Sequence, residues 1–395
     1  MKESGKGKEE KKKIIEIRTF PVPFALEEIK ENIRVSTSIS SKPSKDQIIN
    51  QAFKFHSQGN FSEAAKNYQY FIDQGFNDHR VFSNYGVILE NLRKLEEAER
   101  CQRKAIELNP DFAEAHYNLG IILRDLGKSQ EAELSFRKAI KINPDFAEAH
   151  YNLGIIQLQN GEHNLSLKYF SKSAGLLRGK EIKEPNHKRY KMISKAKIDH
   201  DIEQFEYLAS KGYETKKFSD LAILYEKVAA EIDWQSETQL ISINNKHQSL
   251  LKETYNRLIH QIKAPKLKQI AVSNSLNVEK ITNNYFNHEF GLTYIDDFLS
   301  PTALELLRKF LLESTIWFEV KKDGYLGAYL KEGLASPLIF QIADELRKKF
   351  PKIFKDHSIN QIWAYKYDSR AKNENSSLKG INVHADFAAV NVNFW

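Results

Sequence analysis

One fourteen-residue stretch occurs twice in this chain, and its spacing restricts the fold more than any other feature of the sequence. The residues from Asn109 to Ile122 recur unchanged from Asn143 to Ile156, at a constant offset (143 − 109 = 34). A period of about 34 residues is typical of a repeated helix–turn–helix unit, and such a unit buries its apolar face only against neighbouring copies. The sequence therefore predicts stacked helix pairs that together present a surface.

Small residues recur with the same period at two positions of the repeated unit. Steps of this period connect two series: Gly154, Gly120, Gly86 and Ala52, and Ala132, Ala98 and Ala64. A larger side chain at a helix crossing would push the helices apart, so Gly and Ala are expected where the two helices of one copy cross. Pro110 and Pro144 disfavour a helical conformation in the residue before them, which separates one copy from the next.

These glycines, alanines and prolines, together with the aromatic residues Phe136 and Phe170, stand at the spacing of the tetratricopeptide repeat (TPR) family, which the chain resembles over about residues 45–178. The copies starting near residues 79, 113 and 147 match the family closely. The copy starting near residue 45 has Phe76 in place of the proline and resembles a terminal cap. The resemblance implies a mainly α fold, a solenoid of about four repeats, whose first helices line a groove that binds a peptide or protein segment.

Four asparagines recur with the repeat period on the helix face that the TPR resemblance assigns to the groove: Asn50, Asn84, Asn118 and Asn152. An asparagine amide can both donate to and accept from a peptide backbone, and in some members of the family such asparagines hold an extended peptide. Alternatively, the asparagine was copied with the duplicated repeat and only faces water, and the sequence leaves both interpretations open. The same register places four more residues beside the groove: Tyr117, Tyr151, Arg124 and Asp125.

Composition changes divide the rest of the chain. Residues 1–44 are rich first in Lys and Glu and then in Ser and Pro, which predicts a disordered basic tail and linker. Residues 179–285 lose the repeat period, and we expect them to form a helical connector, with amphipathic helices near 199–232 and 236–263, that caps the last repeat. The basic residues from Lys188 to Lys197 are interpreted as a solvated helix face rather than a phosphate-binding patch.

Charge and cysteine content restrict the partners and the compartment. The net charge of +7 is a small excess of 59 basic over 52 acidic residues, so we expect no specific nucleic-acid partner. The sequence contains no run of about 18 apolar residues, so it predicts no membrane span. The single cysteine, Cys101, fits a reducing compartment and is interpreted as a small buried thiol, so we expect a cytoplasmic protein.

The last part of the chain, residues 286–395, predicts a small α+β segment. We expect a strand over 291–299 and helices opened by Ser300-Pro301 and Ser336-Pro337, because serine caps a helix N-terminus and proline suits its first turn. Strands rich in β-branched and aromatic residues are expected over 359–367 and 381–395.

Within the last run, His384 and Asp386 stand two residues apart, which on a strand puts both side chains on one face, spaced to hold two positions of one metal ion. With the surrounding sequence, residues 289–395 resemble the prolyl-4-hydroxylase-like branch of the 2-oxoglutarate and Fe(II)-dependent oxygenases. The resemblance implies a partial double-stranded β-helix or jelly roll and, if a complete domain exists, Fe(II) and 2-oxoglutarate. His384 and Asp386 would be iron ligands, and Tyr367 or Tyr365 would bind 2-oxoglutarate.

This segment departs from the oxygenase family after Asp386. The family places a second histidine and a basic residue tens of residues further on, whereas this sequence continues for nine residues (395 − 386 = 9). We therefore expect a TPR protein-interaction scaffold with an incomplete, inactive oxygenase-like segment, truncated relative to the family. Two alternatives stay open: a hydroxylase whose downstream half is missing from this sequence, and a TPR-fused glycosyltransferase, which the asparagine series suggests.

Overall fold

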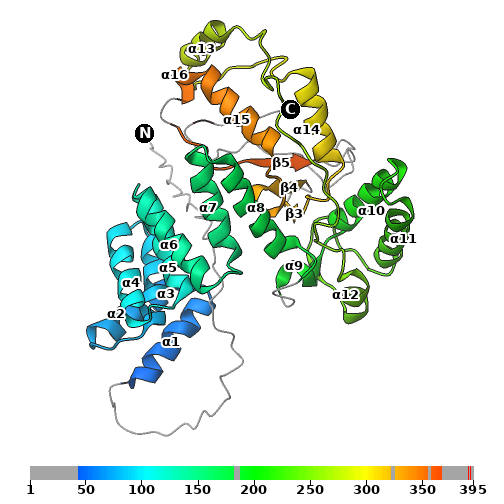
Figure 1. Cartoon of the computed structure of the whole chain (residues 1–395). Helices are drawn as coiled ribbons and strands as arrows, with labels where there is room; N and C mark the ends of the chain where they lie inside the picture. The colour runs from blue at the N-terminus through cyan, green and yellow to red at the C-terminus, as the bar shows by residue number, and fades with distance from the viewer. Residues whose placement is uncertain are drawn as a thin grey trace, which may run out of the picture. The chain divides into compact units, whose positions relative to one another are not determined.

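The computed structural model describes residues 43–181, 187–321, 325–354 and 357–366, together with Val390 and Val392. The predicted tail, apart from residues 43 and 44, lies outside the described residues. The chain divides into two compact units, Met1–Ile142 and Asn143–Trp395. The division falls between the third and fourth copies of the repeat. Figure 1 shows the helices and strands of both units in chain order.

The described residues of the first unit, 43–142, form three helix pairs, as the repeat predicts. In each pair a first helix packs against the helix that follows it: α1 (Lys45–Ser57) with α2 (Phe61–Asp73), α3 (His79–Asn91) with α4 (Leu95–Leu108), and α5 (Ala113–Asp125) with α6 (Ser129–Ile142). The predicted crossing positions are confirmed. A Cβ atom added at Gly120 would lie 2.6 Å from the Phe136 ring, so only glycine permits this approach.

The ends of these helices follow from local sequence. Ser44 caps α1 by accepting a hydrogen bond from the backbone N–H of Gln47, whose side chain in turn accepts from the Ser44 backbone. Asn60 caps α2 in the same way by accepting from the Glu63 backbone N–H. Gly59 and Gly127 follow the first helices with φ of 75° and 77°, a left-handed conformation that glycine adopts without strain.

The second unit begins with the fourth helix pair, α7 (Ala147–Gln159) and α8 (His163–Arg178). The elements that follow are α9 (Lys188–Lys191), β1 (Met192–Ile193), α10 (Lys195–Ser210), α11 (Thr215–Ala230), β2 (Ile241–Ser242) and α12 (Asn245–Leu251). Strands β1 and β2 pair antiparallel. The helical prediction for 199–232 is confirmed as two helices with a turn between them.

The helix predicted over 236–263 is wrong, because only the short α12 forms there. Residues beyond α12 find backbone partners elsewhere in the chain, which removes the need for a helical ladder. The Thr315 hydroxyl accepts from the backbone N–H groups of Ile259 and His260, and Asn256 has a φ of 56°, which is incompatible with an α-helix.

In its described residues, the C-terminal part of the second unit combines helices with a three-stranded sheet. Its elements are α13 (Val278–Asn287), α14 (Pro301–Leu312), β3 (Glu319–Val320), β4 (Leu326–Tyr329), η2 (Leu330–Glu332), α15 (Pro337–Lys349), α16 (Pro351–Phe354) and β5 (Trp363–Lys366). The strand order is β3-β4-β5 with antiparallel pairing, and Gly327 lies opposite Tyr365. Ser300 and Ser336 cap α14 and α15 as predicted.

The strand predicted over 291–299 is wrong, since only an isolated bridge between Val272 and Leu299 forms. Gly291 and Asp297 have φ of 61° and 51°, and left-handed residues interrupt an extended backbone. The strand predicted over 359–367 is confirmed in its second half as β5. The strand predicted over 381–395 lies outside the described residues, apart from Val390 and Val392.

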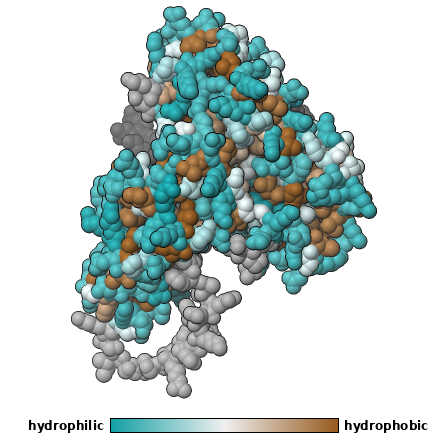
Figure 2. Space-filling model, viewed as in Figure 1, coloured by the Kyte–Doolittle hydropathy of each residue, from teal (hydrophilic) through white to brown (hydrophobic). Residues whose placement is uncertain are grey.

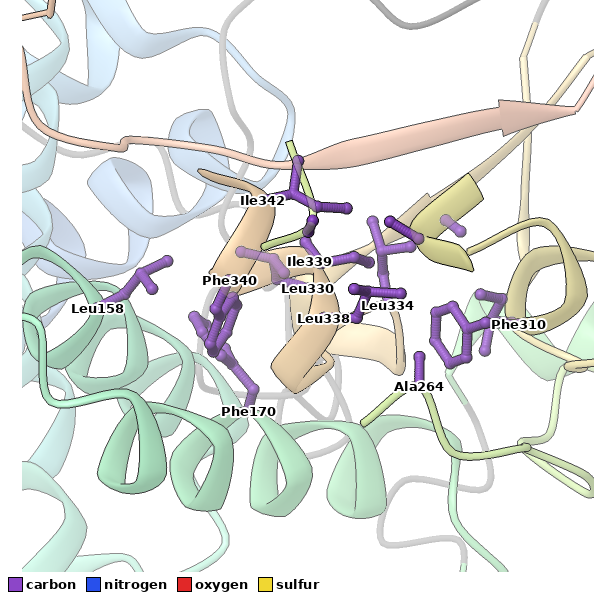
Figure 3. Close-up of a cluster of buried hydrophobic side chains, with 14 of the residues drawn as sticks. Leu158, Phe170, Ala264, Phe310, Leu330, Leu334, Leu338, Ile339, Phe340 and Ile342 are labelled. Carbon is purple, nitrogen blue, oxygen red and sulfur yellow. The ribbon is translucent and has the colours of Figure 1, made fainter. Parts of the chain in front are cut away.

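The largest apolar core of the second unit joins the fourth helix pair to the C-terminal elements. Figure 3 shows Leu158 of α7 and Phe170 of α8 beside Phe340 of α15. The Phe170 and Phe340 ring centroids lie 6.0 Å apart in an edge-on arrangement. Figure 2 shows polar side chains over much of the visible face, with apolar ones scattered between them. The fourth copy of the repeat is therefore part of the core of the second unit.

Candidate functional site

The asparagine series differs in burial from one copy to the next. Asn50 is exposed and Asn118 is half-buried, whereas Asn84 and Asn152 are 9% and 4% exposed. In the first unit, the accessible members of the series are therefore on α1 and α5.

Three of these amides donate hydrogen bonds within the protein. Asn84 Nδ2 lies 3.4 Å from the Tyr68 hydroxyl, and Asn118 Nδ2 lies 3.3 Å from the Ser83 hydroxyl. Asn152 Nδ2 donates to the backbone carbonyl of Glu148 at 2.9 Å. A primary amide has two N–H donors and a carbonyl with two lone pairs, so one such bond leaves hydrogen-bonding capacity at Asn118.

The predicted flanking residues lie on the same helices. Tyr117 is buried against Phe136, with ring centroids 5.8 Å apart, and its copy Tyr151 packs on Phe170 at 5.7 Å. Arg124 and Asp125 form an ion pair, with Nη2 of the arginine 3.2 Å from Oδ1 of the aspartate.

The sequence analysis missed a second row of residues on the helix face that carries the asparagines. Phe53, Val87 and Ile121 also recur with the repeat period, three residues after each asparagine of the first unit, so they share its helix face. The Arg80 guanidinium lies 5.4 Å from the centre of the Phe53 ring. Steps of 34 residues back from Ile121 reach Val87 and then Phe53, so the repeat period could have found this row in the sequence.

The two histidines of the duplicated stretch have a structural role. His116 Nε2 lies 2.9 Å from the carbonyl oxygen of Pro110, and His150 Nε2 lies 3.0 Å from that of Pro144. Burial lowers the pKa of both imidazoles, so they are neutral at pH 7 and act as hydrogen-bond donors to these carbonyls. The duplicated sequence therefore reproduces the same link between loop and helix.

Tyr365 lies on β5, on the sheet face opposite the core. Glu319 and Tyr365 both pair with Gly327, so they stand in one row across the sheet. Burial and a hydrogen bond with Tyr329 raise the pKa of Tyr365. Burial alone would raise the pKa of Glu319, but the Lys321 ammonium at 2.8 Å outweighs it and lowers that pKa.

The other predicted ligands of the C-terminal segment, Tyr367, His384 and Asp386, lie outside the described residues. Within the described part of the chain, no three side chains of His, Cys, Asp or Glu gather as a metal-binding group. The described residues therefore do not form an iron site.

A buried polar cluster links α10 to β5. Lys197, interpreted from the sequence as solvated, is 3% exposed and donates to the Asp201 carboxylate. His200 Nδ1 lies 3.2 Å from that carboxylate, and its Nε2 lies 3.2 Å from Lys366 Nζ. Burial lowers the pKa of His200 to about 4. The solvated-face interpretation is wrong for Lys197, because its Asp201 partner allows the ammonium to be buried.

The helix pairs, their constant period and their glycine crossings define a protein of the helical-repeat class with TPR-type units. Models described as "TPR repeat" and "Tetratricopeptide repeat" match residues 120–161, 101–133 and 79–112. The chain therefore contains tetratricopeptide repeats. No curated protein sequence matches the chain significantly.

Several solved structures are similar to the repeats. "Crystal structure of MamA protein" is 22% identical, covering 47% of this chain and 90% of that one with a TM-score of 0.31. "Crystal structure of YrrB: a TPR protein with an unusual peptide-binding site" is 21% identical, covering 36% and 71% with a TM-score of 0.31. MamA 41-end from Desulfovibrio magneticus RS-1 is 17% identical, covering 33% and 74% with a TM-score of 0.31. Among the described residues, no helix has the length and apolar character needed to cross a membrane.

Proposed function

We propose that this chain is a protein–protein interaction scaffold whose helices α1, α3 and α5 bind a peptide segment of a partner protein. One observation supports this most directly: a row of amides runs beside a row of apolar side chains at the repeat period. The amide row consists of the accessible Asn50 and Asn118 with the buried Asn84 between them, and the apolar row is Phe53, Val87 and Ile121. Apolar contact and hydrogen bonds to a backbone are the two means by which proteins hold peptides.

The charges beside these rows favour a peptide held by backbone and apolar contacts rather than by net charge. Arg80 is paired with Asp78 at 2.8 Å, and Asp125 is paired with Arg93 at 3.3 Å. Because both signs are present and paired locally, the surface offers no single-sign field for a strongly charged ligand. The proposed ligand is therefore an uncharged or weakly charged segment with aliphatic or aromatic side chains.

The test begins with peptides of twelve residues selected from a displayed library on the full chain. Asn118→Ala should weaken binding of a selected peptide by about tenfold, the effect of losing one or two hydrogen bonds. The control is Asn67→Ala, because Asn67 lies on the second helix α2 and its amide also donates within its own helix, to Glu63. Equal affinity of both variants for the peptide would contradict the proposal for Asn118.

A second proposal concerns the sheet face of Tyr365, where a phenol and the Lys321 ammonium could bind a dicarboxylate such as 2-oxoglutarate. The supporting observation is a shared sheet face: Glu319 and Tyr365 both stand opposite Gly327, and Lys321, two residues after Glu319, forms an ion pair with it at 2.8 Å. Calorimetric titration of the full chain with 2-oxoglutarate and Mn²⁺ tests it, with Tyr365→Phe and His384→Ala as variants. Heat of binding that neither variant changes would contradict it.

The absence of oxygenase activity and the cytoplasmic location also stay proposals. Succinate formation from 2-oxoglutarate, measured with Fe(II) and ascorbate present, would contradict the first. Fluorescence microscopy of the tagged chain in its own cells tests the second.

A further inference from the structure

The groove-side face of α7 is a copy of the groove-side face of α5 that has diverged at its end. Tyr151 and Ile155 stand one repeat period after Tyr117 and Ile121 and are identical to them. The duplicated stretch ends at Ile156, and the next groove-side positions differ between the copies. They are Arg124 and Asp125 in α5, and Leu158 and Gln159 in α7.

The chain's own residues 357–362 occupy this face of α7. Gln159 Nε2 donates a hydrogen bond to the backbone carbonyl of Ile359 at 3.0 Å. Ile155 and Leu158 are each 2% exposed and belong to the core cluster against which Ile359 and Ile362 pack. Residues 357–362 have no regular secondary structure, so the segment is held by side-chain contacts and by a bond to its main chain.

The divergence between the copies matches this occupancy. In α5 the two positions form an ion pair, Arg124 with Asp125, that stays partly exposed. Burying such charges against isoleucine would cost their hydration free energy. Leucine contributes apolar area instead, and the Gln159 amide donates to the partly buried carbonyl of Ile359.

Further contacts hold the same C-terminal elements against the fourth helix pair. His163 Nε2 lies 3.1 Å from the Asp344 carboxylate, and the His163 and Phe340 rings are 5.7 Å apart. The contact with residues 357–362 is therefore part of a wider interface within the second unit.

We propose that the α7 face is a peptide-binding site that the chain fills with its own residues 357–362, so that this copy takes no partner. The inference rests on the proposed function only in treating α7 as a copy of a peptide-binding face. It removes Asn152 and Tyr151 from the surface offered to a partner. It also indicates the ligand of such a face: a segment with aliphatic side chains whose main-chain carbonyl accepts a bond from the helix.

The first experiment restores the α5 residues on α7 in the full chain. Leu158→Arg with Gln159→Asp should raise hydrogen exchange of the backbone amides in 357–366 by about tenfold, measured by mass spectrometry. The matched control is the opposite exchange on α5, Arg124→Leu with Asp125→Gln, which should leave these amides unchanged. Exchange that stays within about twofold of the unaltered chain in both variants would overturn the proposal.

The second experiment keeps the α7 face intact and releases its occupant. Ile359→Gly with Ile362→Gly removes the two apolar anchors, and the probe is a fluorescent synthetic peptide with the sequence of residues 357–363. We expect this peptide to bind the variant at least about tenfold more tightly than the unaltered chain, in which the site is already filled. Adding Gln159→Ala to the variant should reverse most of that gain.

Two outcomes of the peptide experiment would overturn the proposal: equal binding to the unaltered chain, or no binding to a variant whose amides in 357–366 have become exchangeable. Neither experiment uses a partner peptide. Failure here therefore leaves the proposal for α1, α3 and α5 standing, and failure of the Asn118 test leaves this one standing.

Discussion

Arg178 and Glu332 form a buried ion pair, with Nη2 of the arginine 2.7 Å from Oε1 of the glutamate and both side chains no more than 5% exposed. Arg178 ends α8, the last helix of the repeats, and Glu332 belongs to η2 in the C-terminal part. The Arg178 guanidinium also lies 4.4 Å from the centre of the Phe318 ring. The second unit therefore joins a repeat helix to residues 154 positions further along the chain.

Removing one member of this pair should destabilise the second unit strongly. Arg178→Met leaves the Glu332 carboxylate buried without its partner, which costs about 3–5 kcal/mol of unfolding free energy. All four tryptophans, Trp234, Trp317, Trp363 and Trp395, lie in the second unit, so tryptophan fluorescence during urea unfolding reports on it. The control is Lys217→Met at the exposed ion pair with Glu214 in the same unit, and a similar loss there would contradict the argument.

The glycine at the crossing of α7 and α8 should not tolerate a methyl group. A Cβ atom at Gly154 would lie 2.7 Å from the Phe170 ring, so Gly154→Ala should lower the free energy of unfolding by about 1–3 kcal/mol. Gly175 lies inside α8 with no atom within 4 Å of such a Cβ, so Gly175→Ala should instead stabilise by about 0.5–1 kcal/mol. Urea unfolding should show changes in unfolding free energy of opposite sign for the two variants. A stabilising Gly154→Ala would contradict the close approach of α7 and α8 at Gly154.

Stability of the second unit should fall as the pH drops from about 6.5 toward 4, partly because of His200. The folded state keeps this imidazole neutral, with a pKa of about 4, whereas the unfolded chain takes up a proton near pH 6.5. Protons then bind the unfolded state preferentially, and one such group contributes up to about 1.4 kcal/mol per pH unit.

The measurement for His200 is urea unfolding at pH 7, 6 and 5. Burial also lowers the pKa of His150 and His260 in the same unit. The informative quantity is therefore the difference between the unaltered chain and His200→Gln, which should show a shallower decline. Parallel declines in the two proteins would contradict this account of His200.

Cys101 should react slowly in the folded protein. Desolvation raises the pKa of its thiol to about 11, which reduces the thiolate fraction at pH 8 by about a hundredfold relative to an ordinary cysteine. Alkylation by iodoacetamide at pH 8 should therefore be much slower in buffer than in urea. Equal rates in the two solvents would show that the thiol is not desolvated.

The sequence by itself determined the helix pairs of the repeats and their boundaries. Helical periodicity, serine and asparagine caps, and the glycines and alanines at crossings act within one or two turns or between adjacent helices. The repeated sequence then forms the same local contacts in each copy, as the equivalent hydrogen bonds of His116 and His150 show. These features need no knowledge of the rest of the fold.

Only the tertiary structure decided what covers each helix face. The sequence of α7 copies that of α5, yet Gln159 donates a hydrogen bond to Ile359, two hundred positions away, and Leu158 belongs to the core cluster against which Ile359 packs. The same reason explains why Lys197 is buried against Asp201 and why no long helix forms over 236–263. The burial of a helix face depends on which distant segment packs against it, and the local sequence pattern of the helix does not specify that segment.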